Sequence, residues 1–230
     1  RDEAVAAYPH AAQRMCVIEP GVRLPDPSGA DDRRAARAQI GLPDAVAQMP
    51  LALFVGNDPV KKGLPALLEA MPQVPRLHLL VVSPDAGVAP MRAQAQRLGV
   101  ADRVHFAGAL SDITQAYAAA DWLVHPTTED TYAMVVLEAM AWGLPVVVSS
   151  ERYCGIAADL RDGIDALLLT DPRDSAQIAQ AIKRLMSDSA LREQLGNAGR
   201  TFAAARTWPL RAAELDSLYQ TIAASKALPR

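Results

Sequence analysis

The sequence has 230 residues, half of them apolar, and 23 basic against 26 acidic side chains give a net charge of −3. This length suits one large domain with a sizeable core, and the slight acidic excess gives no indication of a nucleic-acid partner. The two cysteines, Cys16 and Cys154, form neither a disulfide framework nor a CxxC metal motif, which is typical of a reducing compartment.

Short β-type runs alternate with helical patterns along the chain. Several apolar runs are continuous, as they are in parallel strands covered on both faces. The predicted strands are, in chain order, residues 15–18, 51–55, 77–82, 104–107, 122–124, 145–149 and 166–169. The predicted helices are residues 64–71, 89–98, 113–119, 132–143, 175–186, 190–205 and 209–223. Residues 25–34 are expected to form a long loop or linker.

The repeated order of strand and helix predicts an α/β fold, a Rossmann-like doubly wound parallel sheet. Ligands of such sheets bind beyond the carboxyl ends of the strands, so we expect the site in the loops after Val55, Ala107, Val124 and Ser149. No apolar run reaches the roughly 20 residues that span a bilayer, and we expect no signal peptide. Because the chain begins at Arg1 without a Met, we expect it to be part of a longer protein.

The loop after Val55 carries two lysines directly ahead of a predicted helix. Gly56 and Gly63 bracket this turn, and Lys61 and Lys62 lie between them. A helix N-terminus carries partial positive charge, so lysines are favourable there when an anion such as a phosphate also binds. Two solvated loop lysines explain the pattern equally well. Neither GxGxxG nor GxxxxGK[ST] is present.

Glu138 is the single charged residue in the apolar run 132–143. A buried, unpaired carboxylate is costly, so it needs a partner, and an internal contact and a ligand hydroxyl are equally compatible with the sequence. Asp130, eight residues earlier, suits a helix cap or first-turn acid. The two carboxylates would lie about 12 Å apart along the axis. This excludes a glycosidase pair and, if both contact one ligand, predicts an extended ligand.

The backbone amides between these carboxylates form a second predicted anion site at the start of the helix. They belong to Thr131, Tyr132, Ala133 and Met134. Two anion sites with a carboxylate at either end match the layout of a nucleoside diphosphate sugar. His125 is the histidine nearest these groups, and we expect it to pack in the core or to support its neighbours rather than to act in catalysis.

Five segments together resemble one known family. They are HPTTEDTYAMVVLEAMAWGLPVV, VGNDPVKKG, ADRVHFAGALSDITQAYAAAD, VIEPGVRLPD and WPLRAAELDSLY, and they extend from about Met15 to Tyr219. The first is similar to the acidic motif of GT-B retaining glycosyltransferases of family 4, group 1, and within them to the lipopolysaccharide-core glucosyltransferases. The resemblance implies that residues 1–230 are the C-terminal, nucleotide-sugar-binding domain. Residues 209–225 would be a closing helix toward an absent N-terminal domain that binds the acceptor.

The resemblance also implies a role for each candidate residue. Lys62 would hold the donor phosphates, Asp130 would face the transferred sugar, and both would be catalytic. Glu138 would bind the ribose hydroxyls, and the base would lie near residues 106–109. The other implied donor-binding residues are Gly56, Asn57, Lys61, Phe106, Ala107, Thr131, Tyr132, Ala133, Met134 and Val135.

Four positions depart from the family pattern and leave the identity of the donor open. Asn57 stands where many members have arginine, Asp130 where Glu is usual outside the lipopolysaccharide group, Ala133 where glycine is usual, and Ala158 where Glu is usual. The implied partners are a nucleotide-sugar donor, expected to be a UDP-sugar, and a glycan or lipid-linked acceptor. No DxD triplet is present, so no metal or other cofactor is expected.

The implied reaction is the retaining transfer of a hexose from the donor to an acceptor of lipopolysaccharide type. The implied location is the cytoplasm, either free or at the inner face of a bacterial membrane. Two alternatives stay open at this point. One is a nucleotide-sugar epimerase or hydrolase of the same architecture, and the other is a non-catalytic nucleotide-binding module. We expect the isolated chain to be inactive because the acceptor domain is absent.

Overall fold

The computed structural model describes residues 2–25 and 30–227, and these divide into two compact units. The larger unit spans Leu24–Ala204. The smaller unit combines the two ends of the chain, up to Arg23 and from Ala205 onward. The single-domain prediction for residues 1–230 therefore stays a prediction, and the two units are described separately below.

The smaller unit joins an extended N-terminal segment to the last helix. It contains α1 (Asp2–Ala7), a 3₁₀ helix (Pro9–Arg14) and α9 (Trp208–Ala227), which confirms the helix predicted for 209–223. The strand predicted for residues 15–18 was wrong, because these residues join no sheet. Val22 instead makes an isolated bridge to Thr207. Glu19 holds the same junction by ion pairs with Arg206 and Arg211, at 3.1 Å and 3.3 Å.

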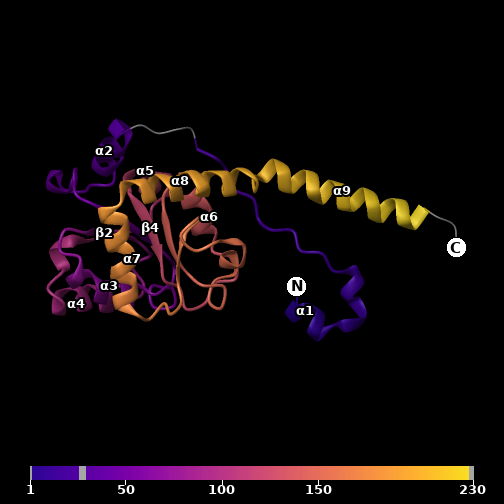
Figure 1. Ribbon diagram of the computed structural model, residues 1–230, viewed down its shortest axis with the longest axis horizontal. Helices are drawn as coiled ribbons and strands as arrows, with labels where there is room; N and C mark the ends of the chain where they lie inside the picture. The colour runs from indigo at the N-terminus through magenta and orange to yellow at the C-terminus, as the bar shows by residue number, and fades with distance from the viewer. Residues whose placement is uncertain (1, 26–29, 228–230) are drawn as a thin grey trace. The chain divides into compact units, whose positions relative to one another are not determined.

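The larger unit is built on a six-stranded parallel sheet in the order β3-β2-β1-β4-β5-β6. Figure 1 labels two of its strands, β2 and β4. The strands are β1 (Leu51–Val55), β2 (His78–Val82), β3 (Val104–Gly108), β4 (Trp122–His125), β5 (Val146–Ser149) and β6 (Leu167–Leu169). The chain runs outward from β1 to β3 and returns to β4, so the strand order reverses between β1 and β4. This confirms the predicted doubly wound sheet, and it places the expected ligand site at that reversal.

Helices cover both faces of this sheet. They are α2 (Ala30–Gln39), α3 (Leu64–Ala70), α4 (Val88–Arg97), α5 (Thr114–Ala119), α6 (Met134–Ala141), α7 (Ser175–Ser187) and α8 (Ser189–Ala204). Short 3₁₀ turns lie at Asp44–Val46, Met71–Gln73, Ala101–Arg103 and Gly155–Asp159. Helix α3 packs with α4 and α7, whereas α2 packs on α5 and α6 on α8 (Figure 1).

Helix α2 corrects the loop predicted for residues 25–34. Residues 26–29 lie outside the described residues, but the helix already begins at Ala30. Its composition is rich in Ala and Arg, which are strong helix formers. Arg37 fixes it to α5 and to the 3₁₀ turn before β1, because its guanidinium donates to the carbonyls of Ala119 and Val46 at 2.8 Å and 2.9 Å. Of the helices described, none is long and apolar enough to cross a bilayer.

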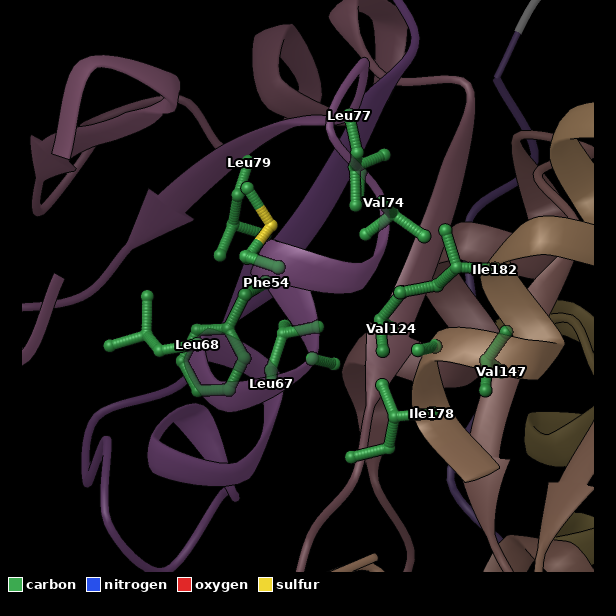
Figure 2. Packing of buried hydrophobic residues seen from close by; sticks show 14 of the residues in the cluster. Phe54, Leu67, Leu68, Val74, Leu77, Leu79, Val124, Val147, Ile178 and Ile182 are labelled. Atoms are coloured by element: carbon green, nitrogen blue, oxygen red, sulfur yellow. The ribbon is translucent and has the colours of Figure 1, made fainter. Parts of the chain in front are cut away.

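The core explains why the strands read as continuous apolar runs. Alternate residues of each strand point to opposite faces, and both faces are covered by helices. On one face, Phe54 and Val124 from the sheet meet Leu67 of α3 and Ile182 of α7, as Figure 2 shows. This packing fixes the strand ends from which the functional loops extend.

Candidate functional site

A cavity of about 360 Å³ opens beyond the carboxyl ends of β1 to β4, at the reversal of strand order. Each of the four strands contributes the residues that directly follow or end it. The lining residues are Val55, Gly56, Asn57, Lys62, Val82, Ser83, Pro84, Ala109, Leu110, His125, Asp130, Ala133, Met134 and Val135. Seven of the predicted site residues therefore share one cavity: Gly56, Asn57, Lys62, Asp130, Ala133, Met134 and Val135.

Lys62, Asp130 and His125 form one charged cluster in this cavity. The Lys62 ammonium donates to Asp130 Oδ2 at 2.5 Å. His125 Nε2 lies 3.1 Å from the same oxygen and must donate to it, because a carboxylate only accepts. His125 is fully buried, and its other nitrogen, Nδ1, has no hydrogen-bond partner among the described residues. The expected supporting role of this histidine takes the form of a hydrogen bond to Asp130.

The pKa values of Asp130 and His125 are both lowered, for different reasons. Burial would raise the pKa of Asp130, but the hydrogen bonds from His125 and Lys62 outweigh it and hold this pKa well below its usual range. Burial lowers the pKa of His125, and this outweighs the opposing effect of Asp130. At neutral pH the site therefore combines an ionised Asp130 with a neutral His125 that carries its proton on Nε2.

Asp130 is also held through its backbone and its second oxygen. Asp130 Oδ1 accepts the amide of Ala133 at 2.8 Å, so this amide is not available as the predicted anion donor. The Asp130 amide donates to Tyr153 O, and the Gly155 amide donates to Asp130 O. The loop after β5 therefore contacts the site through an isolated β-bridge between Cys154 and Asp130. Burial and the charge of Asp130 raise the pKa of Cys154 to about 12.

Ala133 has an unusual backbone conformation at the start of α6. Its φ is 62°, and it is the one non-glycine residue with positive φ among those described. This left-handed conformation costs a residue with a side chain roughly 1–2 kcal/mol, whereas glycine adopts it without that cost. The difference accounts for the glycine that is usual at this position in the family that the sequence resembles. The strain turns the chain so that α6 begins at Met134, two residues later than predicted. The amides of Met134 and Val135, in the first turn, then face the cavity region.

Lys61 does not share the position of Lys62. Its ammonium pairs with Glu129 Oε2 at 3.0 Å, and its side chain is partly exposed. It lines a different hollow, together with Asp58, Val60 and Thr128. The two neighbouring lysines thus point to different surroundings, and only Lys62 lines the cavity.

Glu138 meets an internal partner. The hydroxyl of Tyr117, on α5, donates to Glu138 Oε2 at 2.6 Å. Burial of Tyr117 and the charge of Glu138 raise the pKa of the tyrosine far above its usual range, so the hydroxyl keeps its proton and stays a donor. Of the two partners left open by the sequence, the structure contains the internal one. The contact between Glu138 and a ribose stays a prediction.

Four other predicted residues do not line the cavity: Phe106, Ala107, Thr131 and Tyr132. The ring of Phe106 lies 4.4 Å under the guanidinium of Arg92. Phe106 lies on β3, which ends at Gly108. The two residues that follow this strand, Ala109 and Leu110, line the cavity. Residues 106–109 therefore touch the cavity only at Ala109.

Sequence reasoning missed the contribution of β2. Ser83 and Pro84 follow Val82 and line the cavity, although the loop after this strand was not among those expected to carry the site. The strand itself was predicted, and the rule that ligands bind at carboxyl ends would have found the two residues.

The doubly wound sheet of this chain matches the Rossmann-like halves of GT-B glycosyltransferases, and this match gives the class of its fold. Within that class the chain belongs to the family described as Glycosyl transferases group 1, whose sequence profile matches residues 49–188. The crystal structure of Anabaena Alr3699/HepE in complex with UDP and glucose has the same fold. It matches with a TM-score of 0.81 at 24% identity, over 94% of this chain and 60% of that one.

Two relatives illustrate the range of the family. The D-inositol 3-phosphate glycosyltransferase of Streptomyces bingchenggensis is 32% identical over 234 residues, which cover 95% of this chain and 50% of that protein. The lipopolysaccharide glucosyltransferase WaaG of Escherichia coli is 29% identical over 205 residues, which cover 85% of this chain and 53% of that protein. The chain thus spans about half the length of these relatives.

Proposed function

We propose that this chain is the donor-binding part of a retaining glycosyltransferase that uses a nucleoside diphosphate sugar. The observation that carries the proposal is the position of Lys62, which lines the cavity at the reversal of strand order. Membership in a glycosyltransferase family supports it. Lys62 and the first-turn amides of α6 supply positive charge where a diphosphate would bind.

The proposed chemistry follows from the charge that develops on the leaving group. The bond between the anomeric carbon and the phosphate oxygen breaks, and the nucleoside diphosphate leaves with the electron pair. The oxygen of an acceptor hydroxyl bonds to the same face of the sugar, and its proton passes to the departing diphosphate. Lys62 stabilises the leaving diphosphate electrostatically, and Asp130 orients the lysine and faces the sugar. No divalent metal takes part in this proposal.

The donor is proposed to be a UDP-sugar and the acceptor a glycan or a lipid-linked saccharide. The solved Anabaena protein of the same fold holds UDP and glucose, which makes UDP the first nucleotide to test. One relative is a lipopolysaccharide glucosyltransferase, and another acts on an inositol phosphate. We place acceptor binding outside residues 1–230, since the chain spans about half of these relatives.

The test is isothermal calorimetry with UDP in buffer that contains EDTA. We expect binding without metal, and we expect Lys62→Ala to weaken it by about tenfold or more through the loss of a charged hydrogen bond. Lys61→Ala is the matched control, because Lys61 pairs with Glu129 and does not line the cavity. Its affinity should stay within about twofold of the parent chain.

Two results would overturn the proposal. One is the absence of binding at millimolar UDP, GDP and ADP, and the other is an equal loss of affinity for both lysine variants. Hydrolysis of a UDP-sugar by the chain without an acceptor would instead favour a hydrolase. Binding without transfer, even when an acceptor domain from a relative is supplied, would favour a non-catalytic binding module.

A further inference from the structure

A second cavity, of about 390 Å³, lies at the opposite, amino edge of the sheet. Pro50 precedes β1 and Trp122 begins β4, and both line it. The same two strands end at the donor cavity. Because β1 has five residues, its two ends lie roughly 15 Å apart. No lining residue is common to the two cavities, so they are separate sites.

Arginine dominates the lining of this second cavity. Four arginines line it, Arg33, Arg34, Arg37 and Arg192, together with one acidic residue, Asp121. The chain as a whole is slightly acidic, so this concentration of positive charge is local. Like charges gathered in one concavity repel one another unless an anion compensates them. The cavity is therefore suited to an anionic ligand.

Two of the four arginines already form hydrogen bonds or ion pairs within the protein. Arg37 is 4% exposed and donates to several backbone carbonyls as well as to Asp121 Oδ2 at 3.0 Å. Arg33 pairs with the other oxygen of Asp121 at 3.1 Å. These contacts occupy both carboxylate oxygens. Asp121 is therefore already compensated and does not neutralise the remaining arginines.

The other two arginines keep donors available. The Arg34 side chain is exposed and makes no ion pair or hydrogen bond within the part of the chain that the structure describes. Arg192 uses Nη1 for the carbonyls of Leu185 and Met186, which leaves Nε and Nη2 of its five-donor fork. Guanidinium forks of this kind match the geometry of phosphate oxygens.

Trp122 supplies a spectroscopic probe of this cavity. Its side chain lines the cavity and is 2% exposed. Its indole nitrogen, Nε1, is buried and has no hydrogen-bond partner among residues 2–25 and 30–227. Buried donors without a partner are rare, because the lost hydrogen bond to water is not replaced. Because Trp122 lines the cavity, a ligand bound there changes the surroundings of this indole.

We propose that this cavity binds a phosphate-bearing ligand, either a phosphate monoester or a diphosphate. Arg34 and Arg192 donate to the phosphate oxygens, beside the indole of Trp122. The site does not depend on the proposed donor site, since no residue is shared between them.

The test follows the three indole signals of the chain, from its three tryptophans, by ¹H–¹⁵N NMR during a titration with inorganic pyrophosphate. The Trp122 signal is assigned by its loss in Trp122→Phe. We expect this signal to shift and to saturate, while that of Trp208 stays in place. The titration is repeated in Lys62→Ala, where the proposed donor site is weakened. A saturable shift of Trp122 in both proteins supports the second site whether or not the donor site binds UDP.

Arg34→Ala is the decisive variant, because Arg34 makes no intramolecular bond that its loss could break. We expect it to weaken pyrophosphate binding at Trp122 by about tenfold. Arg97→Ala, the loss of another exposed helix arginine, is the matched control and should leave affinity within about twofold. A shift that does not saturate, or an equal effect of both variants, would overturn the proposal.

Vesicle flotation distinguishes the two sources of the phosphate. Capture by phosphatidic acid vesicles but not by phosphatidylcholine vesicles, abolished by Arg34→Ala, would assign the ligand to a lipid headgroup. Saturable pyrophosphate binding without such capture would assign it to a soluble phosphate compound. The absence of both would contradict the proposal.

Discussion

Asp130 connects three elements at the carboxyl edge of the sheet. One oxygen accepts from Lys62, ahead of α3, and from His125, at the end of β4, while the other accepts the amide that precedes α6. A diphosphate that enters the cavity must share the Lys62 ammonium with this carboxylate. The network therefore orients Lys62. The Asp130 carboxylate would also compete with a diphosphate for the Lys62 ammonium.

The burial of His125 makes stability depend on pH. Its pKa is lowered in the folded chain, chiefly by burial, whereas the unfolded value is about 6.5. The unfolded state therefore binds the proton first as pH falls. The stabilising contribution is fully present above about pH 6.5 and decreases as pH falls toward the folded pKa.

We expect the parent chain to lose stability between about pH 8 and about pH 5.5, and His125→Asn to lose less over the same interval. Urea unfolding at the two pH values measures the difference. His78 and His105 also have lowered pKa values, chiefly through burial, so the variant keeps part of the dependence. His10→Asn, at an exposed position, is the control. An unchanged pH dependence in His125→Asn would contradict this account.

At the scale of elements, two glycines clamp the segment that carries Asp130. A Cβ at Gly63, which precedes α3, would lie 1.8 Å from the carbonyl oxygen of Pro126. A Cβ at Gly155, after β5, would lie 1.9 Å from the carbonyl oxygen of Thr131. The segment between β4 and α6 is thus in close contact with the loop after β1 and with the loop after β5, the two strands beside β4. Side chains at these two positions would push the segment out of place.

We expect Gly155→Ala to destabilise the fold by about 1–3 kcal/mol, since the added methyl group overlaps a backbone oxygen. We also expect it to weaken UDP binding, because Asp130 moves with the segment. Gly163→Ala is the control: its φ is +70° with nothing within 4 Å of the added Cβ. The strain there costs roughly 1–2 kcal/mol and leaves the cavity unchanged. Urea unfolding and calorimetry measure both effects, and unchanged UDP affinity in Gly155→Ala would disprove the clamp.

At the scale of the whole molecule, all residues that line the donor cavity belong to the unit Leu24–Ala204. The same holds for the arginine-lined cavity. The unit contains the complete sheet and the core cluster of Figure 2. Of the described residues at the chain ends, 2–23 and 205–227, none lines either cavity.

We therefore expect a chain of residues 24–204 to fold by itself and to bind UDP within about threefold of the affinity of residues 1–230. Circular dichroism during thermal unfolding and calorimetry test this expectation. A single cooperative transition with preserved affinity would agree with it. Loss of folding, or a loss of affinity of about tenfold or more, would show that the ends of the chain take part in the larger unit.

The sequence by itself determined the alternating strands and helices, the doubly wound sheet and the edge at which the cavity lies. These depend on local patterns: continuous apolar runs mark strands buried on both faces, and spaced apolar residues mark helices. The motif around residues 127–149 also located Asp130 and the start of α6 to within two residues. The strand predicted for 15–18 failed because an apolar run forms a strand only where a neighbouring strand pairs with it.

Only the tertiary structure decided which side chains meet. Lys62 and Asp130 are 68 positions apart in the chain, and Tyr117 and Glu138 are 21 apart. No local pattern encodes such distances, since they depend on how the strands order themselves in the sheet. For the same reason the sequence could not show that Lys61 pairs with Glu129 whereas Lys62 lines the cavity. The arginine-lined cavity likewise exists because the fold brings α2, β4 and α8 together at the amino edge of the sheet.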